Sequence, residues 1–508
     1  MGAFLRTSGR MAVFSFSVVA YIFISFMADA SAAVYYVAPR GSDFAAGTRR
    51  APWGTFAHAM NFLRPGDTLY LLDGTYTLRN NPGQPAILYV TKSGRAGRPV
   101  KIRALHEGKV IVDGQKRVLC YQSRRNYIEV DGINFRSSGG SGSNWGHGMD
   151  LAGNHVTIRR CTIKGFGYNN LSAASGENNS AGINVAGGSN ILLEDNAIFI
   201  NAGTNQHNGS PRMGINLYES NYSIVRRNFI YWQPGGDPAS PKGIQVYGAS
   251  DCIVENNIIA DETNGGDGIF IWYNNYNSHS SNNGAYGNIV MDSSGWAIWT
   301  ATQPNHNPPP FQVHGSNISG NVLIGCPYGL RNGGDNAQVM KNNTIVNIRG
   351  GIPGISICSF KQSGYRAGYT LNTEASNNSL LHCRGAGISA WGSYIGTTNE
   401  DYNNFSTSGH SEKRGPHDKS ISPNYDTHTY GNGAYLMVPI TLRGLGQGGT
   451  GIGATVLYEY QKGALTTRHL WPWPMEHRIL DEFGLSPTWQ QNGGLWKTLK
   501  GVYHKRTK

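Results

Sequence analysis

The stretch Gly243–Trp272, GIQVYGASDCIVENNIIADETNGGDGIFIW, decides the fold, because it holds one complete turn of a repeat and the first strand of the next turn. In Gly243–Tyr247, apolar Ile244 and Val246 occupy alternate positions, the period of two expected of a strand buried on one face. Two further short apolar runs follow, separated by turn residues, and the pattern restarts at Gly268. The stretch therefore predicts one coil of a solenoid, built of three short strands and three turns.

Two independent registers indicate that this coil repeats along the chain. A glycine opens the first strand of each coil, and an asparagine lies between apolar positions later in the same coil. The intervals vary whereas the strand patterns do not, so insertions fall in one loop per coil. The glycine register reads Gly148, Gly182, Gly214, Gly243, Gly268, Gly295, Gly329, Gly354 and Gly387. The asparagine register reads Asn196, Asn228, Asn257, Asn288, Asn321, Asn343 and Asn378.

These registers predict the fold class. Strands that restart in the same sense in every coil pair in parallel, and an asparagine in a tight turn can bond the asparagine stacked on it in the next coil. Connections between parallel strands are right-handed in nearly all proteins. We therefore expect an all-β protein: a right-handed parallel β-helix, or solenoid, with an N-terminal helical cap and an irregular C-terminal extension.

Residues 1–32 have the features of an export signal. Arg6 and Arg10 precede the apolar run Met11–Met27, and small residues after it offer cleavage sites. The run has 17 residues, long for a signal and short for a membrane span, so an uncleaved anchor is the alternative. The predicted location is secreted, periplasmic or cell-surface.

The remaining chain divides into three predicted parts. Residues 33–98 supply a strand, a capping helix within 53–63 and the first coil, and residues 99–400 form the β-helix. Residues 401–508 form the extension, in which apolar spacing predicts a helix over 477–483. We expect this extension to cap the last coil, because terminal repeats need covering. A separate binding module is the alternative.

Charge and cysteine content narrow the class of protein. A formal net charge of +12 suits an acidic partner, such as a polyanionic glycan, an anionic cell surface or nucleic acid. The six cysteines are widely spaced and show no metal-ligand pattern. We therefore expect buried thiols, with at most one disulfide.

Charged pairs alternate in sign from coil to coil between the apolar position and the asparagine position. Opposite charges on neighbouring strands attract, so this pattern predicts a structural charge ladder on the surface. The pairs are Arg159–Arg160, Glu194–Asp195, Arg226–Arg227 and, with one acid, Glu255–Asn256.

The N-terminal segments YYVAPRGSDFAAGT (35–48), PWGTFAHAM (52–60) and RPGDTLYLLDGTY (64–76) resemble a known family. They are similar to the N-terminal cap of the pectate-lyase-like superfamily of right-handed parallel β-helices, nearest to polysaccharide lyase family nine. Together with the coils, the resemblance covers roughly residues 34–400. It is specific for the fold and weak for the reaction.

The resemblance implies an exported, carbohydrate-active protein that acts on an acidic polysaccharide by β-elimination, with Ca²⁺ as a candidate cofactor. A non-catalytic glycan-binding or envelope protein, or a uronate C5-epimerase, is the alternative. The expected partner is the polysaccharide and not nucleic acid. We also expect a monomer without stable membrane insertion.

The first strand of each coil carries the candidate binding surface. Positions one and three after the register glycine point inward, so positions two and four face outward. Aromatic rings can stack on sugar faces, and amides can bond hydroxyl groups. The polar row reads Asp150, Asn184, Asn216 and Gln245, and the aromatic row reads Tyr218, Tyr247, Trp272 and Trp299. The alternative is that these aromatics pack under the loops.

Loops before this strand bring candidate catalytic and metal-binding residues to its edge. For β-elimination, Lys242 is the candidate base, Arg212 the candidate carboxylate clamp, and His147 a further catalytic candidate. Asp261, Glu262 and Asp267 could bind Ca²⁺ through oxygen. Solvated loop acids are the alternative for these three.

The chain departs from the motifs of the related enzymes. Family nine lyases have a motif similar to Asp-Asp-Gly-x-Asp at their Ca²⁺ coil, whereas Gly266–Phe270 and Gly146–Asp150 each keep one acid. The basic lysine of those enzymes lies at position two after the register glycine, where only Arg331 is cationic here. Pro416–Asp418 is similar to part of an alginate epimerase motif, and Gly146–Gly148 to part of a polygalacturonase motif. No known active site therefore transfers directly.

Overall fold

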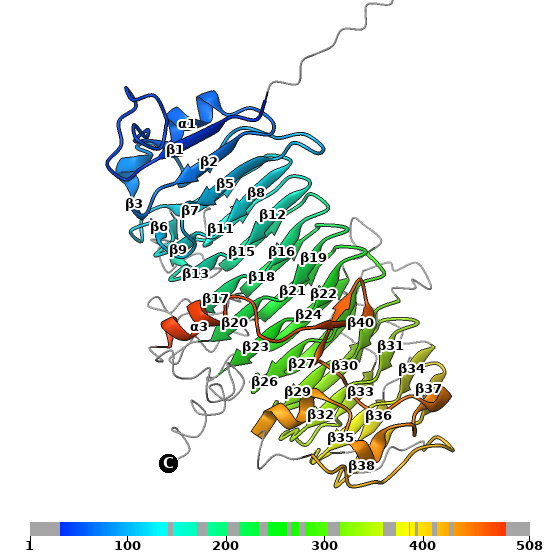
Figure 1. Ribbon diagram of the computed structural model, residues 1–508. Helices are drawn as coiled ribbons and strands as arrows, with labels where there is room; N and C mark the ends of the chain where they lie inside the picture. The colour runs from blue at the N-terminus through cyan, green and yellow to red at the C-terminus, as the bar shows by residue number, and fades with distance from the viewer. Residues whose placement is uncertain are drawn as a thin grey trace, which may run out of the picture. The chain divides into compact units, whose positions relative to one another are not determined.

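Three parallel sheets form the three sides of a right-handed parallel β-helix in a computed structural model of the chain (Figure 1). Apart from the strands at the two ends of each sheet, every strand pairs with strands of the preceding and following coils, so the predicted fold class is confirmed. The structure describes residues 31–140, 146–169, 180–200, 213–232, 242–261, 266–273, 280–302, 315–358, 372–385, 387–391, 395–408, 414–425 and 431–483. Residues 1–30 of the predicted signal, residues 1–32, lie outside these ranges. The predicted carboxylate clamp Arg212 also lies outside them.

Sheet A has thirteen strands, sheet B twelve and sheet C eleven. Sheet A comprises β1 (Val34–Val37), β2 (Thr68–Leu71), β5 (Val100–Ala104), β8 (Ile128–Asp131), β12 (Val156–Arg159), β16 (Leu192–Glu194), β19 (Ile224–Arg226), β22 (Ile253–Glu255), β25 (Gly284–Tyr286), β28 (Asn317–Ser319), β31 (Val339–Lys341), β34 (Thr373–Ser376) and β37 (Thr398–Asp401). Sheet B comprises β3 (Gly74–Tyr76), β6 (Val110–Asp113), β9 (Asn134–Arg136), β13 (Thr162–Lys164), β17 (Ala197–Ile200), β20 (Phe229–Trp232), β23 (Ile258–Asp261), β26 (Ile289–Met291), β29 (Val322–Ile324), β32 (Thr344–Val346), β35 (Ser379–Leu381) and β38 (Asn404–Ser406). Sheet C comprises β4 (Ala86–Val90), β7 (Leu119–Ser123), β11 (Met149–Leu151), β15 (Ala181–Ala186), β18 (Met213–Tyr218), β21 (Lys242–Tyr247), β24 (Asp267–Tyr273), β27 (Trp296–Thr302), β30 (Tyr328–Gly333), β33 (Ile355–Cys358) and β36 (Ile388–Trp391).

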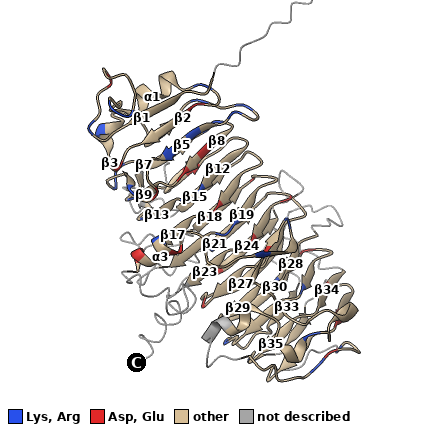
Figure 2. Cartoon of the chain, viewed as in Figure 1, with Lys and Arg blue, Asp and Glu red and all other residues tan. Residues whose placement is uncertain are grey.

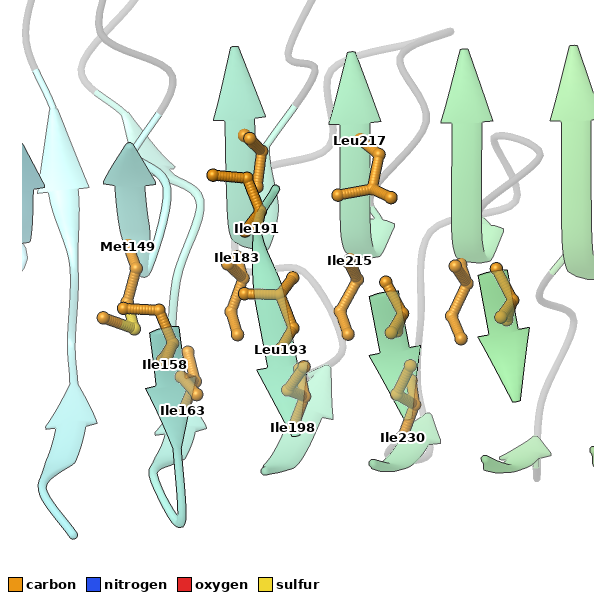
Figure 3. Close-up of a cluster of buried hydrophobic side chains, with 14 of the residues drawn as sticks. Met149, Ile158, Ile163, Ile183, Ile191, Leu193, Ile198, Ile215, Leu217 and Ile230 are labelled. Atoms are coloured by element: carbon orange, nitrogen blue, oxygen red, sulfur yellow. The ribbon is translucent and has the colours of Figure 1, made fainter. Parts of the chain in front are cut away.

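Inward side chains of the three sheets make a continuous apolar core. In one coil, Ile183 of sheet C, Leu193 of sheet A and Ile198 of sheet B meet at the axis, and none is exposed (Figure 3). Ile215 and Ile230 repeat the arrangement in the next coil. Since each coil buries its apolar residues against its neighbours, the stacking of coils stabilises the solenoid and extends this core along the axis.

At several register glycines a side chain would meet the next coil. A Cβ atom on Gly243 would lie 2.5 Å from the carbonyl oxygen of Gly268 and 2.7 Å from Cγ2 of Ile259. The same two obstacles meet a Cβ atom at Gly182 and at Gly214. In these coils, glycine therefore allows the close approach of neighbouring coils at the corner between sheets B and C.

The asparagine register forms the predicted ladder, which is confirmed. The backbone N–H and side-chain Nδ2 of Asn228 both donate to Oδ1 of Asn257, each at 3.0 Å, and Asn257 repeats this with Asn288. Nδ2 of Asn228 also donates to the carbonyl of Leu193 in the preceding coil. Asn403 adds a further rung, and its N–H donates to Oδ1 of Asp418. Because all these groups are buried, each rung satisfies polar atoms that would otherwise be costly.

The charge ladder on sheet A is also confirmed. Arg159 of β12 pairs with Glu129 and Asp131 of β8, and Arg226 pairs with Glu194 at 2.7 Å. In Figure 2, basic residues (blue) on β5 lie beside acidic residues (red) on β8, two neighbouring strands of sheet A. These pairs join consecutive coils, as expected of a structural element.

One coil departs from the predicted glycine register. Ile269 pairs with Ile298 and Phe270 with Trp299, so Ala297, and not Gly295, is the counterpart of Gly268. Gly295 lies two positions too early. Trp299 therefore belongs to the row of Gln245 and Phe270, and its prediction in the row of Tyr247 and Trp272 is wrong.

The N-terminal cap contains helix α1 (Phe56–Phe62), within the range predicted for it. Thr55 begins the helix, because its hydroxyl oxygen accepts the N–H of His58, as an N-cap residue does. Phe56, Ala59 and Met60 are buried in the core. A 3₁₀ turn, η1 (Leu78–Asn80), and the short pair β10 (Gly139–Gly140) and β14 (Tyr168–Asn169) complete the early coils.

The C-terminal extension was predicted to cap the last coil. Instead of ending there, it runs back along sheet B toward the N-terminus (Figure 1). The N–H of Ala454 donates to Thr344, Tyr460 exchanges two hydrogen bonds with Asn256, and Arg478 donates to Thr162. The extension buries the apolar outer face of sheet B, which the sequence analysis did not identify as needing cover. Its elements are η3 (Gly431–Leu436), η4 (Ile440–Leu442), η5 (Gln447–Gly449), β39 (Tyr458–Gln461), β40 (Ala464–His469) and α3 (Glu476–Glu482).

The cysteines match the prediction of buried thiols. All six are free and buried, and burial raises the pKa of Cys120, Cys161, Cys252 and Cys326 to about 12. Within the described ranges, no helix has the length and apolar character needed to cross a membrane.

Candidate glycan-binding face

The outer face of sheet C carries three rows of side chains that follow the axis of the β-helix. The first row directly precedes the register position, the second is the predicted polar row, and the third is the predicted aromatic row. Strand pairing sets all three, because each residue lies beside its counterpart in the next coil. The first row includes Lys242, Asp267 and Trp296. The second row reads Asp150, Asn184, Asn216, Gln245, Phe270, Trp299, Arg331, Ser356 and Ser389. The third row reads Ala186, Tyr218, Tyr247, Trp272, Ala301, Gly333, Cys358 and Trp391.

The polar row bonds to itself. Nδ2 of Asn184 donates to Oδ1 of Asp150 at 3.0 Å, Asn216 donates to Asn184 at 2.9 Å, and Gln245 donates to Asn216 at 3.2 Å. Each carbonyl oxygen thus accepts from the next coil. The amides were predicted to bond sugar hydroxyls, but some of their donor and acceptor atoms are already used in hydrogen bonds within the row.

Asp150 ends this chain of amides in a set of positive and polar donors. Its Oδ2 accepts from Arg124 at 2.7 Å and from Gln122 at 3.2 Å. Burial would raise the pKa of Asp150, but His147, Arg124 and Asn184 outweigh burial and hold the pKa below its usual value. The carboxylate is therefore ionised and saturated with donors, an arrangement that orders the face.

His147 is buried at the same end of the face. Burial lowers its pKa to about 4, with Asp150 opposing this shift and Arg124 adding to it. Its Nδ1 accepts the N–H of Ala181 at 3.0 Å, which places the proton of the neutral ring on Nε2. His147 can therefore donate a hydrogen bond through Nε2, whereas Nδ1 is held by the backbone.

Lys242 and Asp267, predicted as base and metal ligand, form an ion pair. Nζ of Lys242 donates to Oδ2 of Asp267 at 2.5 Å, and Oδ1 of Asp267 accepts the N–H of Trp296 at 2.8 Å. Nζ also lies 5.0 Å from the ring centre of Phe270. Both charged side chains are buried, so the pair is held in one geometry at the edge of the aromatic residues.

Aromatic side chains form a continuous floor across the middle coils. Tyr218 stacks on Tyr247, with ring centres 5.2 Å apart, and Tyr247 lies 6.0 Å from Trp272. Phe270 contacts Trp272 at 5.0 Å and Trp299 at 4.7 Å. Tyr218 is 41% exposed, so this floor reaches the surface at its N-terminal end.

The floor continues to a cation. The guanidinium carbon of Arg331 lies 4.7 Å from the ring centre of Trp299 and 5.4 Å from that of Trp296. Nε of Arg331 donates to Sγ of Cys358 at 3.3 Å. These contacts hold the guanidinium against two indole rings.

The described residues do not fit a calcium ion. Across the described ranges, no three His, Cys, Asp or Glu side chains gather where they could hold a metal. Both carboxylate oxygens of Asp267 already accept hydrogen bonds. The side chains of the other two predicted ligands, Asp261 and Glu262, lie outside the described residues. No reaction step is therefore assigned to calcium.

The fragment Pro416–Asp418, which is similar to part of an epimerase motif, makes contacts that stabilise the last coil. Nδ1 of His417 lies 2.7 Å from Oδ2 of Asp401, and its ring stacks on Tyr402 with centres 4.4 Å apart. Asp418 ends the asparagine ladder by accepting the N–H of Asn403 at 2.7 Å. These residues lie away from sheet C and bind the last coil together.

Two features of this face were missed in the sequence although a signal for each was present. Lys242 and Asp267 both directly precede a register glycine, and this shared position predicts that they are neighbours. Arg331 was noted as a lone cation, but its contact with Trp299 depends on the shifted register of that coil.

Comparison with known proteins gives a family match over the N-terminal coils. Residues 35–209 match the family model described as Pel9A-like, right handed beta helix region. Pectate lyase PEL9 of Emericella nidulans is 38% identical over 96 residues, which make up 19% of this chain and 22% of that protein. The chain spans about a fifth of the length of the curated relatives that it matches first. These matches confirm the resemblance to the pectate-lyase-like superfamily.

Solved structures extend the likeness along more of the chain. A mutant of a PL6 family alginate lyase has a TM-score of 0.51 and 15% identity, covering 77% of this chain and 54% of that one. The A-module of a mannuronan C-5 epimerase from Azotobacter vinelandii has a TM-score of 0.50 and 15% identity, covering 71% and 92%. At this identity the likeness shows the fold alone.

Proposed function

We propose that the protein is an exported polysaccharide lyase, acting as a monomer, that cleaves an acidic polysaccharide by β-elimination on the outer face of sheet C. The matches to pectate lyases over the N-terminal coils support the class of activity. The observation that carries the proposal is the aromatic floor from Tyr218 to Trp299, flanked by the Lys242–Asp267 pair and Arg331. Such a floor suits sugar rings, and its cations suit their carboxylates.

In this reaction a base removes the proton from C5 of a uronate, the C4–O4 bond breaks with its electrons going to the departing sugar oxygen, and a C4=C5 double bond forms. Lys242 is the candidate base. Its ammonium group must first lose a proton, and the Asp267 carboxylate, which accepts from Nζ, is placed to receive it. Arg212 remains the candidate carboxylate clamp, and His147 a candidate hydrogen-bond donor through Nε2.

A non-catalytic glycan-binding role is the second candidate, and one observation favours it. Lys242 is buried and bound to a carboxylate, which suits a structural ion pair as well as a poised base. In that case the aromatic floor would hold a polysaccharide without turnover.

The test is incubation of the purified mature protein with pectate, alginate and glycosaminoglycans, followed by absorbance of unsaturated uronides. A lyase gives a rising absorbance that is lost in Lys242→Met. Retention on a polymer without new chain ends would favour the binding role. Inverted uronate configuration in the NMR spectrum, without cleavage, would indicate an epimerase.

A further inference from the structure

We propose that Arg331 forms a carboxylate-binding subsite for a uronate on sheet C, with the sugar chain continuing along the axis to Trp391. This inference rests on the proposed substrate class, an acidic polysaccharide. It names a residue that distinguishes a uronate from a neutral sugar on the C-terminal half of this face.

Arg331 is the cation of the second and third rows of the face. From β11 to β36, among the described positions of these rows, the other members are aromatic, small, amide or hydroxyl residues, together with Asp150. Asp150 lies about six coils before Arg331 and accepts a hydrogen bond from Arg124. A uronate carboxylate lying on the C-terminal half of the face would therefore meet the charge of Arg331.

The geometry orients the guanidinium. The rings of Trp299 and Trp296 lie within 5.4 Å of its carbon. Contact with aromatic faces restrains the guanidinium, whereas the N–H groups that bind a carboxylate as a fork lie in its plane. Restraint before binding reduces the entropy lost when a ligand is bound.

Small residues in the third row make room for this arrangement. Between Trp272 and Trp391 the row reads Ala301, Gly333 and Cys358. A Cβ atom on Gly333 would lie 3.0 Å from Nε1 of Trp299 and 3.6 Å from Nε of Arg331. The side chains of Trp299 and Arg331 therefore lie close to Gly333, in space that a larger residue at this position would fill.

Trp391 marks the far end of the subsite. Its indole is 48% exposed, and Nε1 donates to Oγ of Ser356 at 3.1 Å, which fixes the ring. It lies two coils beyond Arg331, about 10 Å by strand spacing. A sugar chain bound at Arg331 can thus reach an exposed indole on which a ring can stack.

The test uses the full mature chain in affinity gel electrophoresis, in the cold, through polygalacturonate and through its carboxyl-reduced, neutral counterpart. Arg331→Gln should weaken binding to polygalacturonate by about tenfold or more, because a charge-assisted pair is lost. Binding to the neutral polymer should be unchanged. Arg331→Lys, which keeps the charge but not the fork, should fall between.

The matched control is Lys341→Gln, which removes one positive charge from the same coil but on sheet A, where Lys341 pairs with Glu374 at 2.6 Å. It should change neither affinity. Gly333→Ala should weaken binding to polygalacturonate while keeping the charge, because it displaces Trp299 or Arg331. Thermal melts of every variant separate these effects from unfolding.

Equal loss on both polymers, or no loss in Arg331→Gln, overturns the inference and leaves the proposed function standing if the wild type still cleaves the uronan. A wild type that neither binds nor cleaves any uronan overturns both.

Discussion

The outer faces of sheets B and C both carry rows of aromatic side chains, but their exposure differs. On sheet B, Phe199, Phe229 and Tyr231 are at most 4% exposed and contact Phe483 of the C-terminal extension. On sheet C, Tyr218 is 41% exposed and Trp391 is 48% exposed. The same residue type therefore closes the fold where the chain returns to cover it, and reaches the solvent on sheet C at Tyr218 and Trp391, whereas Phe270 between them is 2% exposed.

The largest expected difference between the two faces is in stability. Phe229→Ala should lower the free energy of unfolding by about 3–5 kcal/mol, because it leaves a cavity under the extension. Tyr247→Ala should cost less, because its side chain is only partly buried and loses fewer contacts. Urea unfolding followed by tryptophan fluorescence compares the two. Equal costs would show that both faces are structural.

The second prediction concerns the buried N-terminal end of sheet C. Because the pKa of His147 is about 4 in the folded chain and 6.5 in the unfolded chain, the unfolded chain binds the extra proton. The resulting stability is present above pH 6.5 and lost as pH falls toward 4, by about 3 kcal/mol in total. This end of the face would thus act as structure, like sheet B.

His147→Asn tests this assignment, since an amide oxygen can replace Nδ1 as acceptor for the N–H of Ala181. The variant should lose most of the pH dependence of unfolding between pH 6.5 and 4, whereas the exposed His106→Asn should keep it. An unchanged slope in His147→Asn would assign the dependence to other groups.

A third prediction tests how the extension is held on sheet B. Nη1 of Arg478 donates to the carbonyl of Arg160 at 2.6 Å, and Nη2 donates to Oγ1 of Thr162 at 2.7 Å. Arg478→Met should cost about 2 kcal/mol, because it breaks buried hydrogen bonds to a charged group. Limited proteolysis should then cleave within residues 431–483 sooner than in the wild type. Unchanged protection would mean that apolar contacts alone hold the extension.

The regular parts of the fold could be predicted because stacking repeats the same requirement in every coil. Each rung of the asparagine ladder satisfies the one before it, and each register glycine excludes a Cβ atom. The glycine register was wrong in one coil, because Ala297 occupies the register position and Gly295, two residues earlier, was assigned to it. That shift placed Trp299 in the wrong row.

The segment that covers sheet B could not be predicted from local patterns. Arg478 contacts Asn134 and Thr162, more than 300 residues earlier in the chain, and no periodicity relates such distant segments. The apolar outward residues of sheet B did signal that something must cover it. The Lys242–Asp267 pair was within reach of the sequence, because both residues precede register glycines in adjacent coils.

The smallest predicted effect, a change in affinity, tests the exposed side of the comparison directly. Trp272→Ala should weaken binding to a uronan by about 2- to 10-fold, since one aromatic contact contributes about 0.5–1.5 kcal/mol. Tyr286→Ala removes an aromatic residue from sheet A, beside Tyr460, and should leave affinity unchanged. Affinity electrophoresis measures both variants, and thermal melts check their folding. If Trp272→Ala loses stability instead of affinity, the aromatic row on sheet C packs under its loops, and the two faces differ in exposure but not in role.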